Sequence, residues 1–110
     1  MADKITLNGA KSVHFIGIGG ISMSGFAEIL KREGFNVSGS DDNSSEITNR
    51  LRELGIPVAI PTSAENITDE IDMVVYTAAI KPDNPEFQAA ESKGITMLER
   101  AAFIGKILPS

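Results

Sequence analysis

Apolar and polar positions alternate along the chain in blocks that predict strands and helices in turn. Short runs rich in β-branched residues predict buried strands, and longer segments with apolar residues at helical spacing predict helices. The expected strands cover residues 12–18, 35–38, 57–60, 73–77 and 96–98. The expected helices cover residues 21–33, a segment around 47–54, residues 85–93 and residues 99–108.

Three of these helices are expected to end in the same C-terminal motif. The stretches KREGF, RELGI and ESKGI each place a glycine, and then an apolar residue, at the end of a helical pattern, at Gly34, Gly55 and Gly94. Glycine adopts the left-handed conformation after a helix, and the apolar residue that follows folds back onto it. A strand follows each time, so strands and helices alternate, as in a parallel sheet with right-handed crossovers. The pattern predicts an α/β fold: a single Rossmann-like doubly wound domain of about five parallel strands, in the order 3-2-1-4-5, with helices on both faces.

Two helix starts carry their own signals. Thr62 and Glu65 have the spacing of a capping box and predict a short turn of helix. Asn84, Pro85 and Glu86 predict a helix with Asn84 as the cap, Pro85 in the first position and Glu86 favoured by the helix dipole.

Length and composition narrow the class of protein. The 110 residues, 42% of them hydrophobic, predict one domain over residues 1–110. The chain has no cysteine, which excludes disulfides and cysteine-based metal sites. It shows neither a signal peptide nor an apolar run of roughly 18–20 residues, so a cytoplasmic protein without membrane contact is expected.

The charge distribution argues against a nucleic-acid partner. The net charge is −5, and no cluster of Lys or Arg forms a basic patch. Arg50 and Arg52 lie among Glu46 and Glu53, which predicts a solvated helix face.

The candidate chemistry lies in the stretch GIGGISMSG, which begins at Gly17 right after the first expected strand. Ligands of doubly wound sheets bind beyond the carboxyl ends of the strands, where the strand order reverses, here between the first and fourth strands. No lysine or arginine occurs between Ser12 and Leu30. Main-chain amides and the positive end of a helix hold a diphosphate without a basic side chain. The stretch matches G-x-G-x-x-G except that Ser22 stands at the position of the last glycine. A plain tight turn between strand and helix is the alternative to a phosphate-binding loop.

Two further loops are expected at the same point. Asp41 lies 24 residues beyond Gly17, at the end of the second strand, where an acidic residue typically binds a ribose hydroxyl; Asp42 is its alternative. Asp41 also fits the cap of the next turn. The loop that starts Thr77-Ala78-Ala79-Ile80 is small and uncharged, which suits backbone contact with a bulky polar ligand or a simple connector.

The remaining residues offer no catalytic group. His14, the only histidine, lies within the first strand, where a hydrogen-bonded interior residue is the expected role. The chain contains no P-loop, no metal-ligand cluster and no pair of nucleophile and base. The residues alone therefore predict a nucleotide-binding domain without catalytic residues of its own.

Four motifs resemble a known family. HFIGIGGISMSGFAEIL, VSGSD, TAAIKPDNPE and ERAAFI, in this order, resemble the N-terminal domain of the Mur ligases, over residues 12 to about 108. They look most like the branch that adds L-alanine to UDP-N-acetylmuramate in bacterial peptidoglycan synthesis.

The resemblance implies an ATP- and Mg²⁺-dependent amide ligase of three domains, of which the first binds the UDP-sugar. Carried over, the diphosphate would contact Gly17, Ile18, Gly19, Gly20, Ile21, Ser22 and Met23. Ser40 and Asp41 would face the uridine. The path toward the sugar would be lined by Thr77, Ala78, Ala79 and Ile80.

Departures from the family pattern set further expectations. The family's P-loop would lie a little beyond Leu108, so we expect this chain to be the first domain of a longer parent, without ligase activity, cofactor or metal of its own. ATP, Mg²⁺ and a central ATPase domain in cis would belong to the parent. Ser22 and Thr77 keep small or hydroxyl side chains, whereas Ala102 stands where glutamate is frequent and leaves the role of Arg100 open.

Three alternatives stay open at this point. The glycine stretch and Asp41 also suit an NAD-type dinucleotide-binding module of an oxidoreductase or a regulator. A ligase that recycles murein peptides shares the UDP-muramoyl substrate, although the TAAI loop favours the alanine-adding branch. The third alternative is a non-enzymatic module that associates through an exposed sheet edge or helix face. A homodimer of the isolated domain is also expected to be possible, through the surface that would otherwise contact the central domain.

Overall fold

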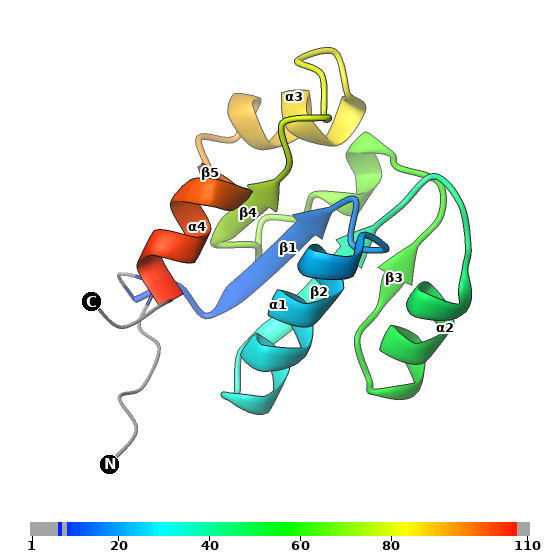
Figure 1. The fold of residues 1–110 in the computed structure, drawn as a ribbon. Helices are drawn as coiled ribbons and strands as arrows, with labels where there is room; N and C mark the ends of the chain where they lie inside the picture. The colour runs from blue at the N-terminus through cyan, green and yellow to red at the C-terminus, as the bar shows by residue number, and fades with distance from the viewer. Residues whose placement is uncertain (1–6, 8, 108–110) are drawn as a thin grey trace.

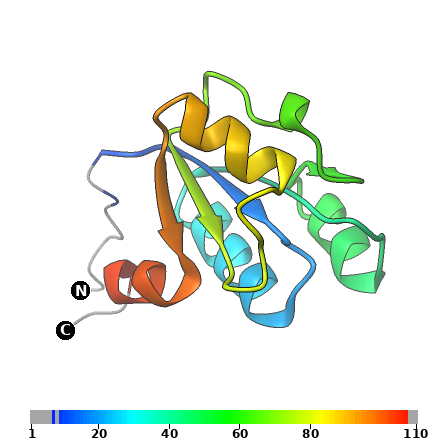
Figure 2. The ribbon, with the colours of Figure 1, turned by 90° about the horizontal axis from the view of Figure 1, so that it is seen from above.

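The computed structural model describes residues 7 and 9–107, which fold into one parallel sheet between two layers of helices (Figures 1 and 2). The strands are β1 (Ser12–Ile16), β2 (Asn36–Ser40), β3 (Val58–Ala59), β4 (Met73–Tyr76) and β5 (Thr96–Glu99). The helices are α1 (Ile21–Arg32), α2 (Glu46–Glu53), the 3-10 turn η1 (Ala64–Asn66), α3 (Pro85–Ser92) and α4 (Arg100–Ile107). The strand order is β3-β2-β1-β4-β5 and every pair is parallel, which confirms the predicted fold class and topology.

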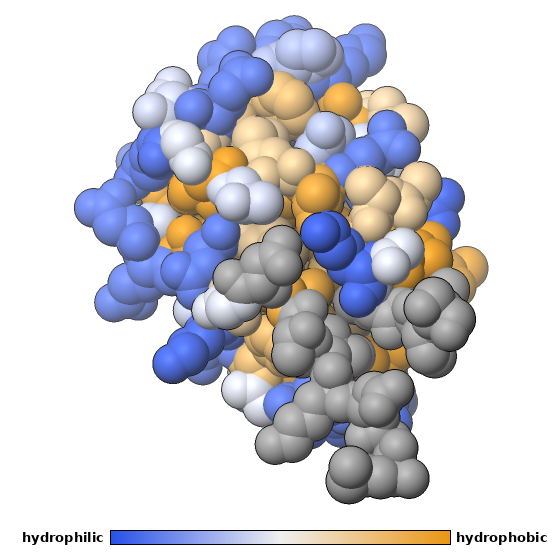
Figure 3. All heavy atoms as spheres, turned by 90° about the vertical axis from the view of Figure 1, so that its left-hand side faces the viewer, coloured by the Kyte–Doolittle hydropathy of each residue, from blue (hydrophilic) through white to orange (hydrophobic). Residues whose placement is uncertain are grey.

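The two faces of the sheet have separate cores. In Figure 2, α1, α2 and α4 lie on one side of the sheet, and α3 and η1 lie on the other. Phe103 of α4 packs edge-on against Phe15 and Phe26, with ring centroids 5.8 and 5.7 Å apart. On the other face, Ile16 and Val74 form a smaller apolar cluster with residues of the loop after η1 and with Ala90 of α3. Figure 3, which looks onto the left-hand side of Figure 1, where α4 and the edge strand β5 lie, shows apolar atoms between hydrophilic ones.

The glycine stops are confirmed. Gly34, Gly55 and Gly94 have φ of 94°, 88° and 70°. In each case the amide of the next residue returns to a helix carbonyl, as in the bond from Phe35 N to Leu30 O of 3.0 Å. This bond closes the last turn of the helix and directs the chain into the following strand.

Several predicted strand boundaries were wrong for reasons of backbone geometry. The first strand ends at Ile16 and not at residue 18, because Gly17 turns the chain with a φ of 82°. The second strand begins at Asn36, since Phe35 closes the helix, and it continues through Gly39 and Ser40, which pair with β1. The third strand has two residues, 58–59, rather than four.

The two predicted helix starts fared differently. Asn84 caps α3, and its Oδ1 accepts hydrogen bonds from the amides of Glu86 and Phe87 at 2.9 and 3.1 Å. The predicted capping box at Thr62 was wrong, because Ser63 is the cap of η1 and accepts from the amide of Glu65. The crossover between β3 and β4 is therefore a single 3-10 turn and an extended loop in place of a full helix.

No helix among residues 9–107 is long and apolar enough to cross a membrane.

Candidate nucleotide-binding site

Three loops meet where the strand order reverses, at the carboxyl ends of β1, β2 and β4 (Figure 1). They cover residues 17–20, 41–45 and 77–84. The amide of Gly19 donates to Asp41 Oδ2 over 2.9 Å, which joins the first two loops. The side chain of Ile80 lies against Gly17, since a Cβ added there would be 3.9 Å from Ile80 Cδ1. The predicted convergence of the three loops is therefore present.

Internal hydrogen bonds occupy the amides of the glycine loop itself. Gly17 N and Ile18 N both donate to Ser40 O at 2.9 Å, and Gly20 N donates to Gly17 O at 3.2 Å. With Gly19 N bound to Asp41, all four loop amides have an acceptor within the protein. These bonds fix the loop on the end of β2. The hydrogen-bond donors available to a ligand therefore lie further along the chain.

Those donors lie in the first turn of α1. The first main-chain bond of the helix runs from Ser24 N to Gly20 O at 2.8 Å, so the amides of Ile21, Ser22 and Met23 precede the helical ladder. The N-cap is Gly20, which has no side chain to cap these amides, and the first turn contains no acidic residue. An uncapped helix N-terminus favours an anion through both its N–H groups and its dipole.

The side chains around this turn divide into two groups. Ile18 and Met23 are buried in the core, so only their main chains face the loop. Ile21 is 84% exposed and Ser22 is exposed, and both lie on the open side of the helix start. The stretch thus combines core residues that hold the loop with exposed residues that border the uncapped amides.

Gly39 has a role that the sequence pattern did not indicate. A Cβ added at this residue would lie 2.6 Å from Ile18 Cβ, closer than real side chains approach. The loop residue Ile18 therefore packs directly on the backbone of β2, and only glycine leaves it room.

Asp41 is half-buried, and of the two roles that were weighed for it the structure shows the turn-capping one. One carboxylate oxygen accepts from Gly19 N, and the other accepts from Asn43 N at 3.3 Å, which is the turn-capping role. Its carboxylate also lies beside the glycine loop, where the ribose contact was predicted. The contact with a ribose or uridine stays a prediction.

Ser40, predicted to face the uridine, is fully buried. Its Oγ donates to Glu86 Oε1 over 2.6 Å, and its carbonyl accepts the two loop amides described above. The side chain therefore points into the interior, and the structural role that follows is support of the loop.

The loop after β4 forms a small turn, in which Ile80 N donates to Thr77 O at 3.0 Å. Ala78 and Ala79 are exposed at its tip, while Ile80 packs on the smaller core cluster. The exposed tip borders the site opposite the loop after β2.

Sequence reasoning missed Glu86 as a part of this region. Its carboxylate is fully buried and accepts hydrogen bonds from His14 Nε2 at 2.7 Å, Ser40 Oγ at 2.6 Å, Ser63 N at 3.0 Å and Asn66 Nδ2 at 2.8 Å. Burial of the carboxyl raises the pKa of Glu86, but these hydrogen bonds together lower it below its usual value. His14, as predicted, is a hydrogen-bonded interior residue; a lone histidine in a buried strand was the available signal that a buried partner exists.

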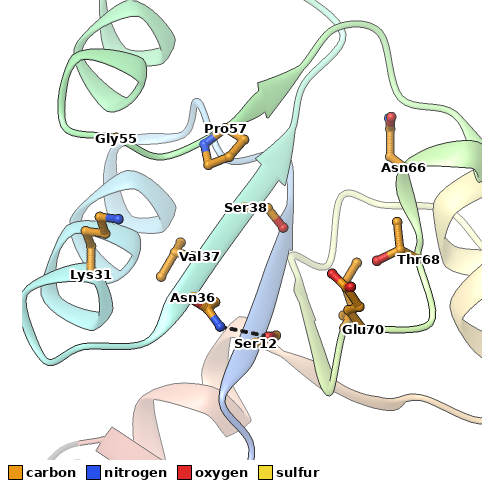
Figure 4. Close-up of a pocket in the computed structure, with 11 residues that line it drawn as sticks. Ser12, Lys31, Asn36, Val37, Ser38, Gly55, Pro57, Asn66, Thr68 and Glu70 are labelled. Atoms are coloured by element: carbon orange, nitrogen blue, oxygen red, sulfur yellow. Dashed lines mark hydrogen bonds between the residues drawn. The ribbon is translucent and has the colours of Figure 1, made fainter.

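A cavity of about 400 Å³ lies elsewhere, beside the first half of β2 (Figure 4). Its walls include Ser12, Asn36, Ser38, Asn66 and Thr68, which come from β1, β2 and the segment around η1. None of its lining residues belongs to the three loops, so the uncapped amides of α1, and not this cavity, define the candidate site.

The described residues contain no group of three or more His, Cys, Asp or Glu side chains able to hold a metal ion. The sequence contains no P-loop.

The chain is similar to proteins of one family. The family described as "Mur ligase family, catalytic domain" matches residues 12–109. The UDP-N-acetylmuramate--L-alanine ligase of Lachnospira eligens is 58% identical over 105 residues, which cover 96% of this chain and 23% of that relative. The chain thus spans about a quarter of the length of this curated relative.

Solved structures give the same result. The crystal structure of a UDP-N-acetylmuramate-alanine ligase from Thermotoga maritima superposes with a TM-score of 0.82 at 40% identity, over 84% of this chain and 21% of that one. The UDP-N-acetylmuramate:L-alanyl-gamma-D-glutamyl-meso-diaminopimelate ligase from Neisseria meningitides follows with a TM-score of 0.78 at 30% identity, over 86% of this chain and 30% of that one.

Proposed function

The chain belongs to the Mur ligase family, and from this premise we propose that it forms the UDP-N-acetylmuramate-binding part of an ATP-dependent ligase that adds L-alanine to that substrate in peptidoglycan synthesis. The observation that carries the proposal is the uncapped start of α1 at the point where the strand order reverses. A site of this kind suits the diphosphate of a UDP-sugar. The 58% identity to a relative named for that reaction supports the choice of substrate.

In the proposed complex, the amides of Ile21, Ser22 and Met23 donate to the diphosphate. Gly20 leaves the approach open because it has no side chain. Glycines 17, 19 and 20 shape the loop, which the carbonyl of Ser40 holds by two hydrogen bonds.

The uridine would extend from the diphosphate toward the loop after β2, near Asp41. The sugar would pass the tip of the loop after β4, at Thr77, Ala78, Ala79 and Ile80. These residues bind and orient the substrate, and we assign no catalytic residue among them.

The whole ligase would use ATP and Mg²⁺ to activate the carboxylate of the UDP-sugar substrate by phosphorylation. Because the sequence contains no P-loop, we propose that other parts of a longer parent bind ATP and Mg²⁺, and that residues 1–110 alone do not form the amide bond. A central ATPase domain in cis is the expected partner of this one. A cytoplasmic location belongs to the same proposal, and so does the assignment of residues 1–110 as one substrate-binding domain.

A homodimer remains a prediction. Two apolar side chains of the edge strand β5 are half-buried, those of Met97 and Leu98. Such a surface suits either another domain of the parent or a second copy of the chain.

Two rival functions receive less support. A murein-peptide ligase is favoured less. The chain is 30% identical in sequence to the Neisseria meningitides ligase described above, against 58% for the alanine-adding relative. An NAD-binding module would use the same loop and Asp41, but the family match is to ligases.

Titration of the chain with UDP-N-acetylmuramate, UDP and NAD, followed by calorimetry and amide NMR, tests the proposal. We expect saturable binding of both uridine ligands, with the largest amide shifts at Ile21, Ser22 and Met23, and no binding of NAD. Binding of NAD without UDP would instead favour a dinucleotide module. Failure of all three ligands to bind would contradict a UDP site in this part of the chain.

A further inference from the structure

The carboxylate of Glu86 joins four elements of the fold at the base of the proposed site. It accepts from His14 of β1, from Ser40 of β2, and from Ser63 and Asn66 at η1, while Glu86 itself belongs to the first turn of α3. Each oxygen accepts two hydrogen bonds. The group is fully buried, so no water competes for these bonds.

We propose that Glu86 is a positioning residue of the UDP site, whose carboxylate fixes the end of β2 beneath the glycine loop and so orients the amides that receive the diphosphate. This inference rests on the proposed function. It adds a buried residue that lies outside the predicted substrate contacts.

The link from Glu86 to the loop is short. Ser40 Oγ donates to Glu86 Oε1 over 2.6 Å, and the carbonyl of the same Ser40 accepts from Gly17 N and Ile18 N at 2.9 Å. The two loop amides are thus held by a residue that Glu86 holds. The start of α1 follows directly, since Gly20 N is bound to Gly17 O.

The loop after β4 ends at the main chain of the same residue. Asn84 closes that loop and caps α3 through a bond from the amide of Glu86 at 2.9 Å. The loops after β2 and β4, which border the site from its two sides, are therefore both anchored at Glu86. Movement of this residue would change the width of the site as well as the orientation of the amides.

The arrangement requires a carboxylate and not merely a polar side chain. All four partners donate a hydrogen bond to Glu86. The donors are the main-chain N–H of Ser63, the side-chain amide of Asn66, the hydroxyl of Ser40 and the Nε2–H of His14. A carboxylate offers acceptors only. A glutamine would turn an N–H₂ group toward two donors and leave buried polar groups unpaired.

The variant Glu86→Gln tests this role, because it keeps the size of the side chain and removes its charge. We expect the affinity for UDP to fall about tenfold or more, which corresponds to about 1.4 kcal/mol. We also expect the amide NMR signals of Gly17 and Ile18 to shift before any ligand is added. The matched control is Glu91→Gln, the same change at an exposed residue of α3, which should leave UDP affinity within about twofold and the loop amides unmoved.

A purely structural role predicts a different result. In that case Glu86→Gln lowers the melting temperature, but the folded fraction binds UDP as the unchanged chain does and the amides of Gly17 and Ile18 stay in place. That outcome overturns the proposal.

Ser40→Ala serves where Glu86→Gln does not fold, since it deletes only the hydroxyl between the carboxylate and β2. The same shifts of Gly17 and Ile18 and a similar loss of affinity are expected, and an unaltered loop overturns the proposal. Failure of the unchanged chain to bind UDP would refute the proposed function instead. The ligand-free amide shifts would then still decide whether Glu86 positions the loop.

Discussion

Gly39 shows how one residue without a side chain determines where a binding loop lies. Ile18 packs over its Cα, and an added Cβ would lie 2.6 Å from Ile18 Cβ. The backbone of β2 cannot move away, because Gly39 is paired with Phe15 of β1 and its amide donates to Pro57 O at 3.0 Å. The contact thus couples the core to the loop of the proposed site.

The substitution Gly39→Ala is therefore expected to lower the free energy of unfolding by about 1–3 kcal/mol, as overpacking of a core does. Urea unfolding followed by circular dichroism measures this change, and the method suits a chain without tryptophan. Gly25→Ala is the matched control. Gly25 lies in the middle of α1 with nothing within 4 Å of an added Cβ, so alanine should raise the stability by about 0.5–1 kcal/mol. Equal stability of Gly39→Ala and the unchanged chain would refute the packing of Ile18 on β2.

Residue types alone did not indicate the role of Gly39 or the burial of Ser40. In the stretch VSGSD, glycine is a poor strand former, so the predicted strand ended at Ser38, before Gly39 and Ser40. In the fold, pairing with β1 on one side and β3 on the other holds these residues extended. At this point tertiary pairing outweighs local preference, and it extends the strand by two residues beyond the predicted end.

At the scale of elements, the prediction was reliable where a local rule decides the backbone. Gly34, Gly55 and Gly94 were expected to end helices, and each does so with a positive φ. The Asn84 cap was predicted equally well. Between β3 and β4 the predicted short turn of helix is present as η1, but its cap is Ser63 and not Thr62. Ser63 and Asn66 are held there by Glu86, which lies 23 and 20 positions further along the chain, so no local rule indicates the cap.

The start of α1 is the element on which the proposed function depends, and Ser22→Asp tests it. Ser22 is exposed in the first turn, where an aspartate interacts favourably with the helix dipole. We expect the free chain to gain about 0.3–1 kcal/mol of stability. The same carboxylate would repel a bound diphosphate, so UDP affinity should fall about tenfold or more.

The opposite signs of these two effects make the test specific. Calorimetry gives the affinity and urea unfolding gives the stability of the same variant. Ser22→Asn is the control, since it has nearly the same shape without the charge and should bind UDP more tightly than Ser22→Asp. Unchanged affinity of Ser22→Asp for UDP would show that the diphosphate does not lie at the start of α1.

At the scale of the whole molecule, the alternation of strands and helices sufficed to predict the sheet order, but the buried network was beyond sequence reasoning. His14 and Glu86 are 72 positions apart, and they meet only because β1 lies under α3 across the sheet. A strand histidine and a helix-start glutamate each have an ordinary local explanation. Their pairing requires the tertiary structure.

This network makes the stability of the whole domain sensitive to acid. Burial raises the pKa of Glu86. Hydrogen bonds from His14, Asn66 and Ser40 lower it by more than burial raises it, so that the folded pKa lies below the usual value of 4.5. A group whose pKa is lower in the folded state stabilises the fold at pH values above the unfolded pKa. That contribution is lost as the pH falls from about 4.5 through the folded pKa. Asp72, whose pKa is lowered mainly by the amides of Lys11 and Ser12, adds to the loss.

We therefore expect the free energy of unfolding to fall as the pH is lowered from about 5 to 3, and to fall less steeply in Glu86→Gln than in the unchanged chain. Urea unfolding at a series of pH values measures both slopes. Glu91→Gln retains the Glu86 carboxylate and should follow the unchanged chain, while Asp72 is present in all three proteins and cancels in the comparison. Where Glu86→Gln is too unstable, the NMR shift of the Glu86 carboxyl carbon in the unchanged chain reports its titration directly. Parallel slopes in all three proteins, or titration of that carbon above pH 4.5, would show that the buried carboxylate does not stabilise the folded state as an anion.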